Sequence, residues 1–160
     1  MDDQLKRIHR AYDLSVTRYL QNIDPFIDVP DEFKNSPEFK TFLQEGRECN
    51  GGAADIKKFL APKSGMRFLD AGCGGGLAEY YLHDWSSEYN GVDISQKMIE
   101  AMREYVTRKK IAIGGLWVAD LAKLPFENNF FDITMVIGVF EYYPQEYCRQ
   151  SLAEIHRCRA

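Results

Sequence analysis

The apolar residues of the first part of the chain follow a helical spacing. Over residues 1–50 they recur every three or four positions, which would place them on one face of a helix: Leu5, Ile8, Tyr12, Val16, Tyr19 and Leu20. Prolines interrupt this pattern between residues 25 and 30, and Ser36-Pro37 is a typical start for a further helix ending at Gly46. We therefore expect residues 1–50 to form a helical segment.

From residue 66 the pattern changes to short apolar runs that alternate with amphipathic stretches. The apolar runs predict strands at residues 66–70, 89–93, 116–119 and 131–139. The amphipathic stretches predict helices at 77–82 and 145–157, and another that begins after Ser95 and ends at the basic run 108–110. A further short helix is expected at 53–60, before the change of pattern. Alternation of this kind is typical of an α/β domain, here residues 51–160, in which helices cover both faces of a parallel sheet.

Composition and charge exclude several classes of protein. The net charge of −4 comes from acidic and basic residues that are mixed along the chain, so no basic face for nucleic acid is expected. The first residues contain no apolar signal sequence, and the apolar stretch Ile133–Phe140 is too short to span a membrane. We therefore expect a cytoplasmic protein. The four cysteines show no C-x-x-C spacing, so no metal site is expected.

The most informative motif is a cluster of glycines directly after a predicted strand. That strand ends in Asp70 and continues into Gly72, Gly74 and Gly76, which leave a turn without side chains. Backbone N–H groups at the start of the next helix can then approach a polar ligand closely. Asp93 ends the second predicted strand, where doubly wound folds place a carboxylate on ribose hydroxyls. The two features together predict a nucleoside-binding site.

Two details favour S-adenosylmethionine over a dinucleotide at this site. The dinucleotide fingerprint has a third glycine five residues after the first, and Leu77 stands there instead. Asp70 lies two residues before the first glycine, where its charge would repel a pyrophosphate but attract the ammonium and sulfonium groups of S-adenosylmethionine. A nicotinamide-dependent reaction is therefore disfavoured.

At this level of detail residues 55–157 resemble the class I S-adenosylmethionine-dependent methyltransferases. The similar motifs are Phe68–Gly76, Gly91–Ser95, Ala119–Phe126 and residues 131–142. The resemblance implies a Rossmann-like, doubly wound and mostly parallel sheet. It also implies S-adenosylmethionine as the cofactor, S-adenosylhomocysteine as the product and a small molecule as the methyl acceptor.

The resemblance also implies roles for single residues at the methionine end of the cofactor. Gly72 and Gly74 would hold the methionine part, with Asp70 supporting the loop. Gly138, at the end of the fourth strand, would border the methyl group. Cys73 stands in the same loop, and we interpret its side chain as a packing residue because no histidine or lysine lies near it in sequence.

Further roles are implied at the adenosine end. Asp93 would accept hydrogen bonds from the ribose hydroxyls, and Ile94 would lie against the adenine. Asp120 would receive the adenine amino group, with the backbone of Leu121 beside it. A simple turn-capping role for Asp120 is the alternative.

The catalytic candidates follow the fourth predicted strand. Glu141 either orients the acceptor and accepts its proton or is a solvated loop carboxylate. Tyr142 and its neighbour Tyr143 either form a cation–π wall near the sulfonium or close the end of the sheet. The helical segment 1–50 is either a lid over the cofactor or a helix pair packed on the sheet.

The end of the sequence departs from the family pattern. Family members continue with further strands where this chain has Cys158–Ala160, so we expect about four strands in the order 3-2-1-4 and a C-terminally truncated domain. The apolar fourth strand, Ile133–Phe140, would then be an edge for a second copy or a partner chain to pair with. The first hypothesis is a small-molecule methyltransferase. The alternative is a fragment or regulatory module that binds S-adenosylmethionine without independent activity.

Overall fold

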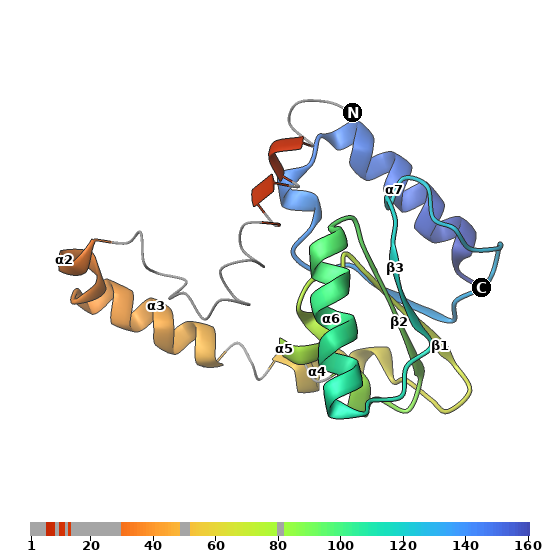
Figure 1. Ribbon diagram of the computed structural model, residues 1–160, viewed down its shortest axis with the longest axis horizontal. Helices are drawn as coiled ribbons and strands as arrows, with labels where there is room; N and C mark the ends of the chain where they lie inside the picture. The colour runs from red at the N-terminus through yellow and green to blue at the C-terminus, as the bar shows by residue number, and fades with distance from the viewer. Residues whose placement is uncertain (1–5, 9, 12, 14–29, 49–51, 80–81) are drawn as a thin grey trace.

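A four-stranded sheet forms the centre of the computed structural model, which describes residues 6–8, 10–11, 13, 30–48, 52–79 and 82–160 (Figure 1). The strands are β1 (Arg67–Ala71), β2 (Glu88–Asp93), β3 (Gly115–Val118) and β4 (Ile133–Met135). They lie in the order β3-β2-β1-β4, and every neighbouring pair is parallel. The predicted α/β class and the predicted order 3-2-1-4 are both confirmed.

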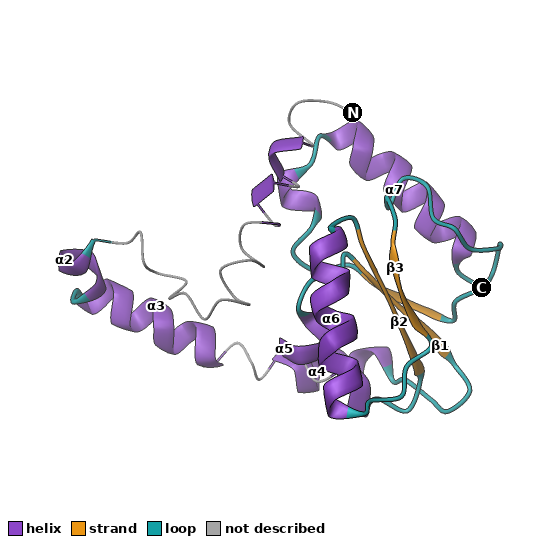
Figure 2. Ribbon diagram, in the orientation of Figure 1, coloured by secondary structure: helices purple, strands orange, loops and turns teal. Residues whose placement is uncertain are grey.

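Helices cover the two faces of this sheet (Figure 2). The helices are α2 (Asp31–Lys34), α3 (Pro37–Glu48), α4 (Gly52–Leu60), α5 (Gly76–Glu79), α6 (Gln96–Lys109) and α7 (Gln145–Cys158), with 3-10 turns η2 (Leu82–Asp84) and η3 (Phe140–Tyr142). The helices α4, α5 and α6 lie on one side of the sheet and α7 on the other, whereas α2 and α3 stand apart from it.

Alternation along the strands produces two separate apolar cores. Phe68 of β1 and Tyr89 of β2 point to one face, where they pack with Ile99 of α6. Leu69 of β1 points to the other face and packs with Ile155 of α7. Both faces of the central strands are thus buried, as parallel sheets require.

The ends of α6 follow from the local sequence. The side chain of Ser95 accepts a hydrogen bond from the backbone N–H of Met98 (3.2 Å) and caps the helix. At the other end Lys110 adopts a left-handed conformation (φ 55°), and Arg108 and Lys109 occupy the last turn. Cations complement the helix dipole there, so the interpretation of the basic run as a helix end is confirmed.

The N-terminal helices agree with the prediction in part. Ser36 caps α3, because its hydroxyl accepts the N–H of Phe39 (3.1 Å), but α3 continues past Gly46 to Glu48. Ile8 is helical. The other positions of the predicted apolar stripe lie outside the described residues: Leu5, Tyr12, Val16, Tyr19 and Leu20.

Two predicted elements differ in detail from the structure. The helix predicted at 77–82 overlaps α5 and the first residue of η2, and residues 80–81 between them lie outside the described residues. The strand predicted at 131–139 is only β4, because the backbone at Gly138 turns into the left-handed region (φ 67°) and cannot continue a strand. Phe131, which precedes β4, forms a parallel bridge with Arg159, and this bridge lies outside the edge expected along Ile133–Phe140.

Two features are absent from the described residues. None of their helices is long and apolar enough to cross a membrane. The same residues contain no group of three or more histidine, cysteine or acidic side chains that could hold a metal ion.

Candidate functional site

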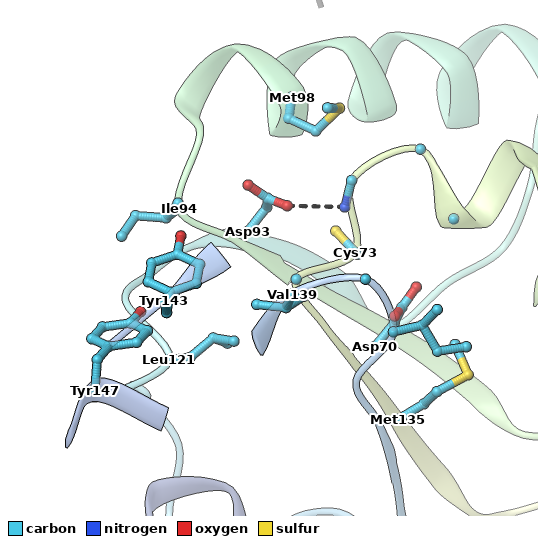
Figure 3. Close-up of a pocket in the computed structure, with 16 residues that line it drawn as sticks. Asp70, Cys73, Asp93, Ile94, Met98, Leu121, Met135, Val139, Tyr143 and Tyr147 are labelled. Atoms are coloured by element: carbon cyan, nitrogen blue, oxygen red, sulfur yellow. Dashed lines mark hydrogen bonds between the residues drawn. The ribbon is translucent and has the colours of Figure 1, made fainter. Parts of the chain in front are cut away.

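A cavity of about 310 Å³ lies at the carboxyl ends of β1, β2 and β4 (Figure 3). Its walls come from the glycine loop (residues 72–76), the junction of β2 with α6, the residues after β4 and the start of α7. This volume is in the range of small-molecule sites. Ligands of open α/β sheets bind at this end of the strands, beside the point where the strand order reverses, which here is between β1 and β4.

The glycine loop is tied to β2 by its main chain. The carbonyl oxygen of Val92 accepts hydrogen bonds from the N–H groups of Gly72 and Cys73, both at 2.8 Å. Gly72 has a left-handed backbone (φ 78°), and a Cβ there would collide with Cγ2 of Val139. Position 72 therefore requires glycine for its conformation and for the close approach of the segment after β4.

Asp93 joins the loop to the start of α6. Its Oδ2 accepts the N–H of Gly74 (2.9 Å), which Figure 3 shows as a dashed line, and its Oδ1 accepts the N–H of Ser95 (2.9 Å). The carboxylate also lines the cavity. These two bonds fix its orientation toward the ligand side, where it remains able to accept hydroxyl groups.

Asp70 is a nearly buried carboxyl at the floor of the cavity, with 3% of its surface exposed. The hydroxyl of Tyr89 donates a hydrogen bond to its Oδ2 at 2.8 Å. Burial raises the pKa of Asp70 to about 7, the Tyr89 hydrogen bond acts in the opposite direction, and the charge of Asp93 raises it further. Near neutral pH the group therefore exists in both protonation states.

Of the residues predicted to bind the adenosine end of the cofactor, some line the cavity and one does not. Ile94 and Leu121 line the cavity, as does Met98 of α6. Asp120 is exposed and is not among the lining residues. Its Oδ1 accepts hydrogen bonds from the N–H of Ala122 (2.9 Å) and from a tyrosine hydroxyl of α7.

The residues after β4 form the opposite wall. Gly138 and Val139 line the cavity, and beyond them Tyr143 stacks on Tyr147 with ring centroids 4.5 Å apart and an angle of 18° between the planes. Figure 3 shows both rings on the side of Ile94 and Leu121. The catalytic candidates Glu141 and Tyr142 lie in η3, are exposed and are not among the lining residues.

The structure adds lining residues that the sequence interpretation did not assign to the site. They are Met98, Met135, Ile137 and Tyr147. Tyr147 donates to Asp120 (2.7 Å) and lies in the first turn of α7, four residues after Tyr143. That spacing was the available signal for it.

The side chain of Cys73 packs within the protein behind the glycine loop. The side chain is buried, and its sulfur lies 3.0 Å from the position of a Cβ built on Gly91. Burial raises the pKa of the Cys73 thiol well above its usual range, and the charges of Asp70 and Asp93 raise it further. The thiol stays protonated and is a poor nucleophile.

The charges of the wall indicate which ligands fit. The described lining residues include two carboxyl groups, those of Asp70 and Asp93, but no lysine, arginine or histidine. Their other ionisable side chains are the protonated thiol of Cys73 and two tyrosines. A pyrophosphate would be repelled here, whereas a ligand with ammonium and sulfonium groups would be attracted. The residues present thus fit S-adenosylmethionine.

Comparison with known proteins supports the same conclusion. Residues 69–159 match the family model of the methyltransferase domain. Phosphoethanolamine N-methyltransferase 3 of Arabidopsis thaliana is 28% identical over 134 residues, which are 80% of this chain and 26% of the plant protein.

Two solved structures have a similar fold. A protein of Pyrococcus horikoshii is 27% identical with a TM-score of 0.59, over 79% of this chain and 52% of that one. Phosphoethanolamine N-methyltransferase 2 of Haemonchus contortus, solved with phosphomonomethylethanolamine and S-adenosylhomocysteine, is 28% identical with a TM-score of 0.60, over 68% of this chain and 25% of that one. The chain thus spans about a quarter of the length of the two phosphoethanolamine N-methyltransferases.

Proposed function

The chain belongs to the methyltransferase domain family, and on that basis we propose that it transfers a methyl group from S-adenosylmethionine to a small-molecule acceptor. S-adenosylmethionine is the cofactor, and it supplies an electrophilic methyl group on a sulfonium centre. The observation that carries the proposal is a cavity in which the glycine loop, Asp93 and the turn after β4 meet around two carboxyl groups, with no lysine, arginine or histidine among the described lining residues.

At the methionine end the loop would hold the cofactor mainly through its main chain. Gly72 and Gly74 allow close approach, and Cys73 contributes its backbone while its side chain fills the space behind the loop. Asp70 would bind the ammonium group from the floor of the cavity. Gly138 would border the methyl group, because the turn at this residue brings the segment after β4 against the loop.

At the adenosine end the roles divide between a carboxylate and apolar side chains. Asp93 would accept the ribose hydroxyls, and Ile94 and Leu121 would lie against the adenine. Asp120 would receive the adenine amino group on Oδ2, because its Oδ1 already accepts two hydrogen bonds, one of them from Tyr147.

The acceptor would enter from the wall after β4. The stacked rings of Tyr143 and Tyr147 offer an apolar and π-rich surface for a small organic or cationic acceptor. Glu141 and Tyr142, next to this wall in η3, are the side chains proposed to orient the acceptor or take its proton. Positioning alone can lower the barrier of a methyl transfer by about 7–11 kcal/mol, so a strong base is not required.

The N-terminal segment is proposed to cover the cofactor. Asp13 accepts a hydrogen bond from the hydroxyl of Ser95 (2.6 Å), which lies two residues after Asp93. The described part of the segment therefore reaches the edge of the cavity. This contact supports a lid more than a helix pair packed elsewhere on the sheet.

Calorimetric titration with S-adenosylmethionine and S-adenosylhomocysteine tests the cofactor site. We expect micromolar binding by the wild type and a loss of at least about 100-fold in Asp93→Ala, because the variant removes both the ribose acceptor and two main-chain hydrogen bonds. Asp132→Ala is the matched control. Asp132 also accepts a backbone N–H, from Arg67 at 2.7 Å, but at the opposite end of the sheet.

The outcomes separate the proposal from its alternatives. Binding by the wild type and by Asp132→Ala, with loss in Asp93→Ala, supports the site. A wild type that binds neither ligand, while circular dichroism shows it folded, would refute it. Methyl transfer from labelled cofactor to a panel of small amines and phenols then distinguishes an enzyme from a module that only binds.

A further inference from the structure

Two buried polar side chains meet behind the glycine loop. The hydroxyl of Tyr89 on β2 donates a hydrogen bond to Oδ2 of Asp70 on β1 (2.8 Å). Tyr89 and Asp70 are 2% and 3% exposed, yet Asp70 lines the cavity and Tyr89 does not. The hydrogen bond therefore connects the interior of the sheet to the ligand side.

The strand register makes room for this contact. Asp70 is paired with Gly91, and Tyr89 precedes Gly91 by two residues, so Tyr89 and Asp70 are diagonal neighbours on one face of the sheet. A Cβ on Gly91 would lie 3.2 Å from Cε1 of Tyr89 and 3.0 Å from Sγ of Cys73. The missing side chain at Gly91 leaves the space in which the tyrosine ring reaches the carboxyl.

The groups around Asp70 oppose one another. Burial disfavours the ionised carboxyl, the Asp93 charge disfavours it as well, and the Tyr89 hydroxyl favours it, which leaves the pKa of Asp70 at about 7. Cys73 contributes no charge, because burial raises the pKa of its thiol. Burial and the neighbouring Asp70 also raise the pKa of Tyr89, so the phenol remains a hydrogen-bond donor at any working pH.

We propose that Tyr89 is a positioning residue for the cofactor: its hydroxyl orients the Asp70 carboxyl and favours the anionic form that binds the ammonium group of S-adenosylmethionine. The inference rests on the proposed function, and Tyr89 acts only through Asp70. Without this donor the carboxyl is buried beside a second carboxylate and becomes protonated. A neutral acid then attracts the ammonium group only weakly.

The test compares two ligands that differ in the amino acid part. S-adenosylhomocysteine carries the ammonium group, whereas 5′-methylthioadenosine has the adenosine and the sulfur but lacks it. In Tyr89→Phe, at about pH 7, we expect S-adenosylhomocysteine to bind about tenfold more weakly and 5′-methylthioadenosine to change by less than about twofold. Titration from about pH 6 to about pH 7.5, where the ligand ammonium stays protonated, should show affinity rising with pH and a profile displaced to higher pH in the variant.

Matched variants keep the result specific. Tyr105→Phe removes a hydroxyl from α6 beside the same core and should leave both ligands unaffected. Asp70→Asn should reproduce the ligand pattern of Tyr89→Phe, and the double variant should show no further loss. If Tyr89→Phe folds poorly, Asp70→Asn still tests whether the carboxylate binds the ammonium group.

Three results are decisive. Selective weakening of S-adenosylhomocysteine supports the inference. Equal weakening of both ligands, or no weakening of either, overturns it and leaves the proposed function intact. A folded wild type that binds neither ligand would contradict the proposed function itself.

Discussion

The two sides of the cavity are built in different ways. On the β1–β2 side (residues 70–76 and 93–95), the carbonyl of Val92 accepts two main-chain N–H groups and the carboxylate of Asp93 accepts two more. On the β4 side (residues 136–143 and Tyr147), a strand of three residues ends early, and the wall depends on side-chain packing such as the stacked pair Tyr143 and Tyr147. One side is held mainly by hydrogen bonds from backbone N–H groups, whereas the other depends more on packing between side chains.

This difference matches what each side would have to recognise. Main-chain hydrogen bonds between neighbouring strands do not depend on side-chain identity, so they suit a cofactor that is the same throughout a family. A wall of side chains on a loop and a helix start can change shape by substitution, which suits acceptors that differ. The two sides meet where Gly72 contacts Val139.

That contact gives the largest expected effect. Gly72→Ala should lower the free energy of unfolding by about 4 kcal/mol, because a left-handed conformation is unfavourable for alanine and the new methyl group collides with Val139. Chemical denaturation measures the change. Cofactor binding should be lost at the same time, because the loop and the β4 side can no longer approach.

Two variants separate the collision from the conformational strain. Gly65 also has a positive φ (85°), but a Cβ there meets nothing within 4 Å, so Gly65→Ala should lose only about 1 kcal/mol. Adding Val139→Ala to Gly72→Ala should recover part of the stability. If the two glycine variants lose equally, the close approach of the two sides is not what requires glycine at position 72.

The next effect is a pH dependence of stability that comes from the buried carboxyl group of Asp70 on the β1–β2 side. The pKa of Asp70 is raised from 3.8 to about 7, so the unfolded chain ionises first and folding favours the protonated acid. This contribution to stability is complete below pH 3.8 and is lost as the pH rises through about 7. Between about pH 4.5 and about pH 7.5 the wild type should lose about 3 kcal/mol relative to Asp70→Asn.

Urea denaturation of both proteins across this range measures that difference. Glu141→Gln, which removes an exposed carboxylate of the β4 side, is measured alongside as the comparison variant. A wild type that gains stability relative to Asp70→Asn as the pH rises would show that the folded protein prefers the ionised Asp70.

The same contrast explains what could be predicted from the sequence. The glycine loop, Asp93 and the strand order follow from local motifs, because the loop is held by its own backbone and by the adjacent strand. The end of β4 could not be predicted, because the apolar run 131–139 has the pattern of a long buried strand. The bridge from Phe131 to Arg159 depends on contact with a distant segment, and the left-handed backbone at Gly138 ends the extended conformation that the apolar pattern predicts.

The site residues, too, could be predicted from the sequence only where a local motif places them. Asp70, Gly74 and Ile94 line the cavity as their motifs suggest, whereas Tyr147 enters it only because α7 packs beside the β4 side. Roles for Glu141, a cytoplasmic location, a truncated domain and a partner at the β4 edge stay predictions.

Tyr147 offers a smaller effect on the β4 side. Tyr147→Phe removes the hydrogen bond to Asp120 and should lower the free energy of unfolding by about 1 kcal/mol, because the stacked ring stays in place. Cofactor affinity should fall by only about twofold to fivefold, which equals about 0.4–1 kcal/mol. Tyr147→Ala, which also removes the ring from the wall, should have the greater effect in the same titration. If the two variants lose cofactor affinity equally, the Tyr147 hydroxyl rather than its stacked ring contributes to cofactor binding.

The smallest effect is expected at Glu141, and it separates cofactor binding from acceptor chemistry. Glu141 lies in η3 with an exposed side chain that is not among the residues lining the cavity, so Glu141→Gln should change cofactor affinity by less than about twofold, or about 0.4 kcal/mol. A role in orienting the acceptor or accepting its proton would instead lower the rate of methyl transfer at saturating cofactor and leave the titration unchanged. Gln145→Glu, which adds a carboxylate at the start of α7, serves as the charge-reversed control. A large loss of cofactor affinity in Glu141→Gln would mean that the β4 side holds the cofactor as firmly as the β1–β2 side, and the contrast between the two sides would not stand.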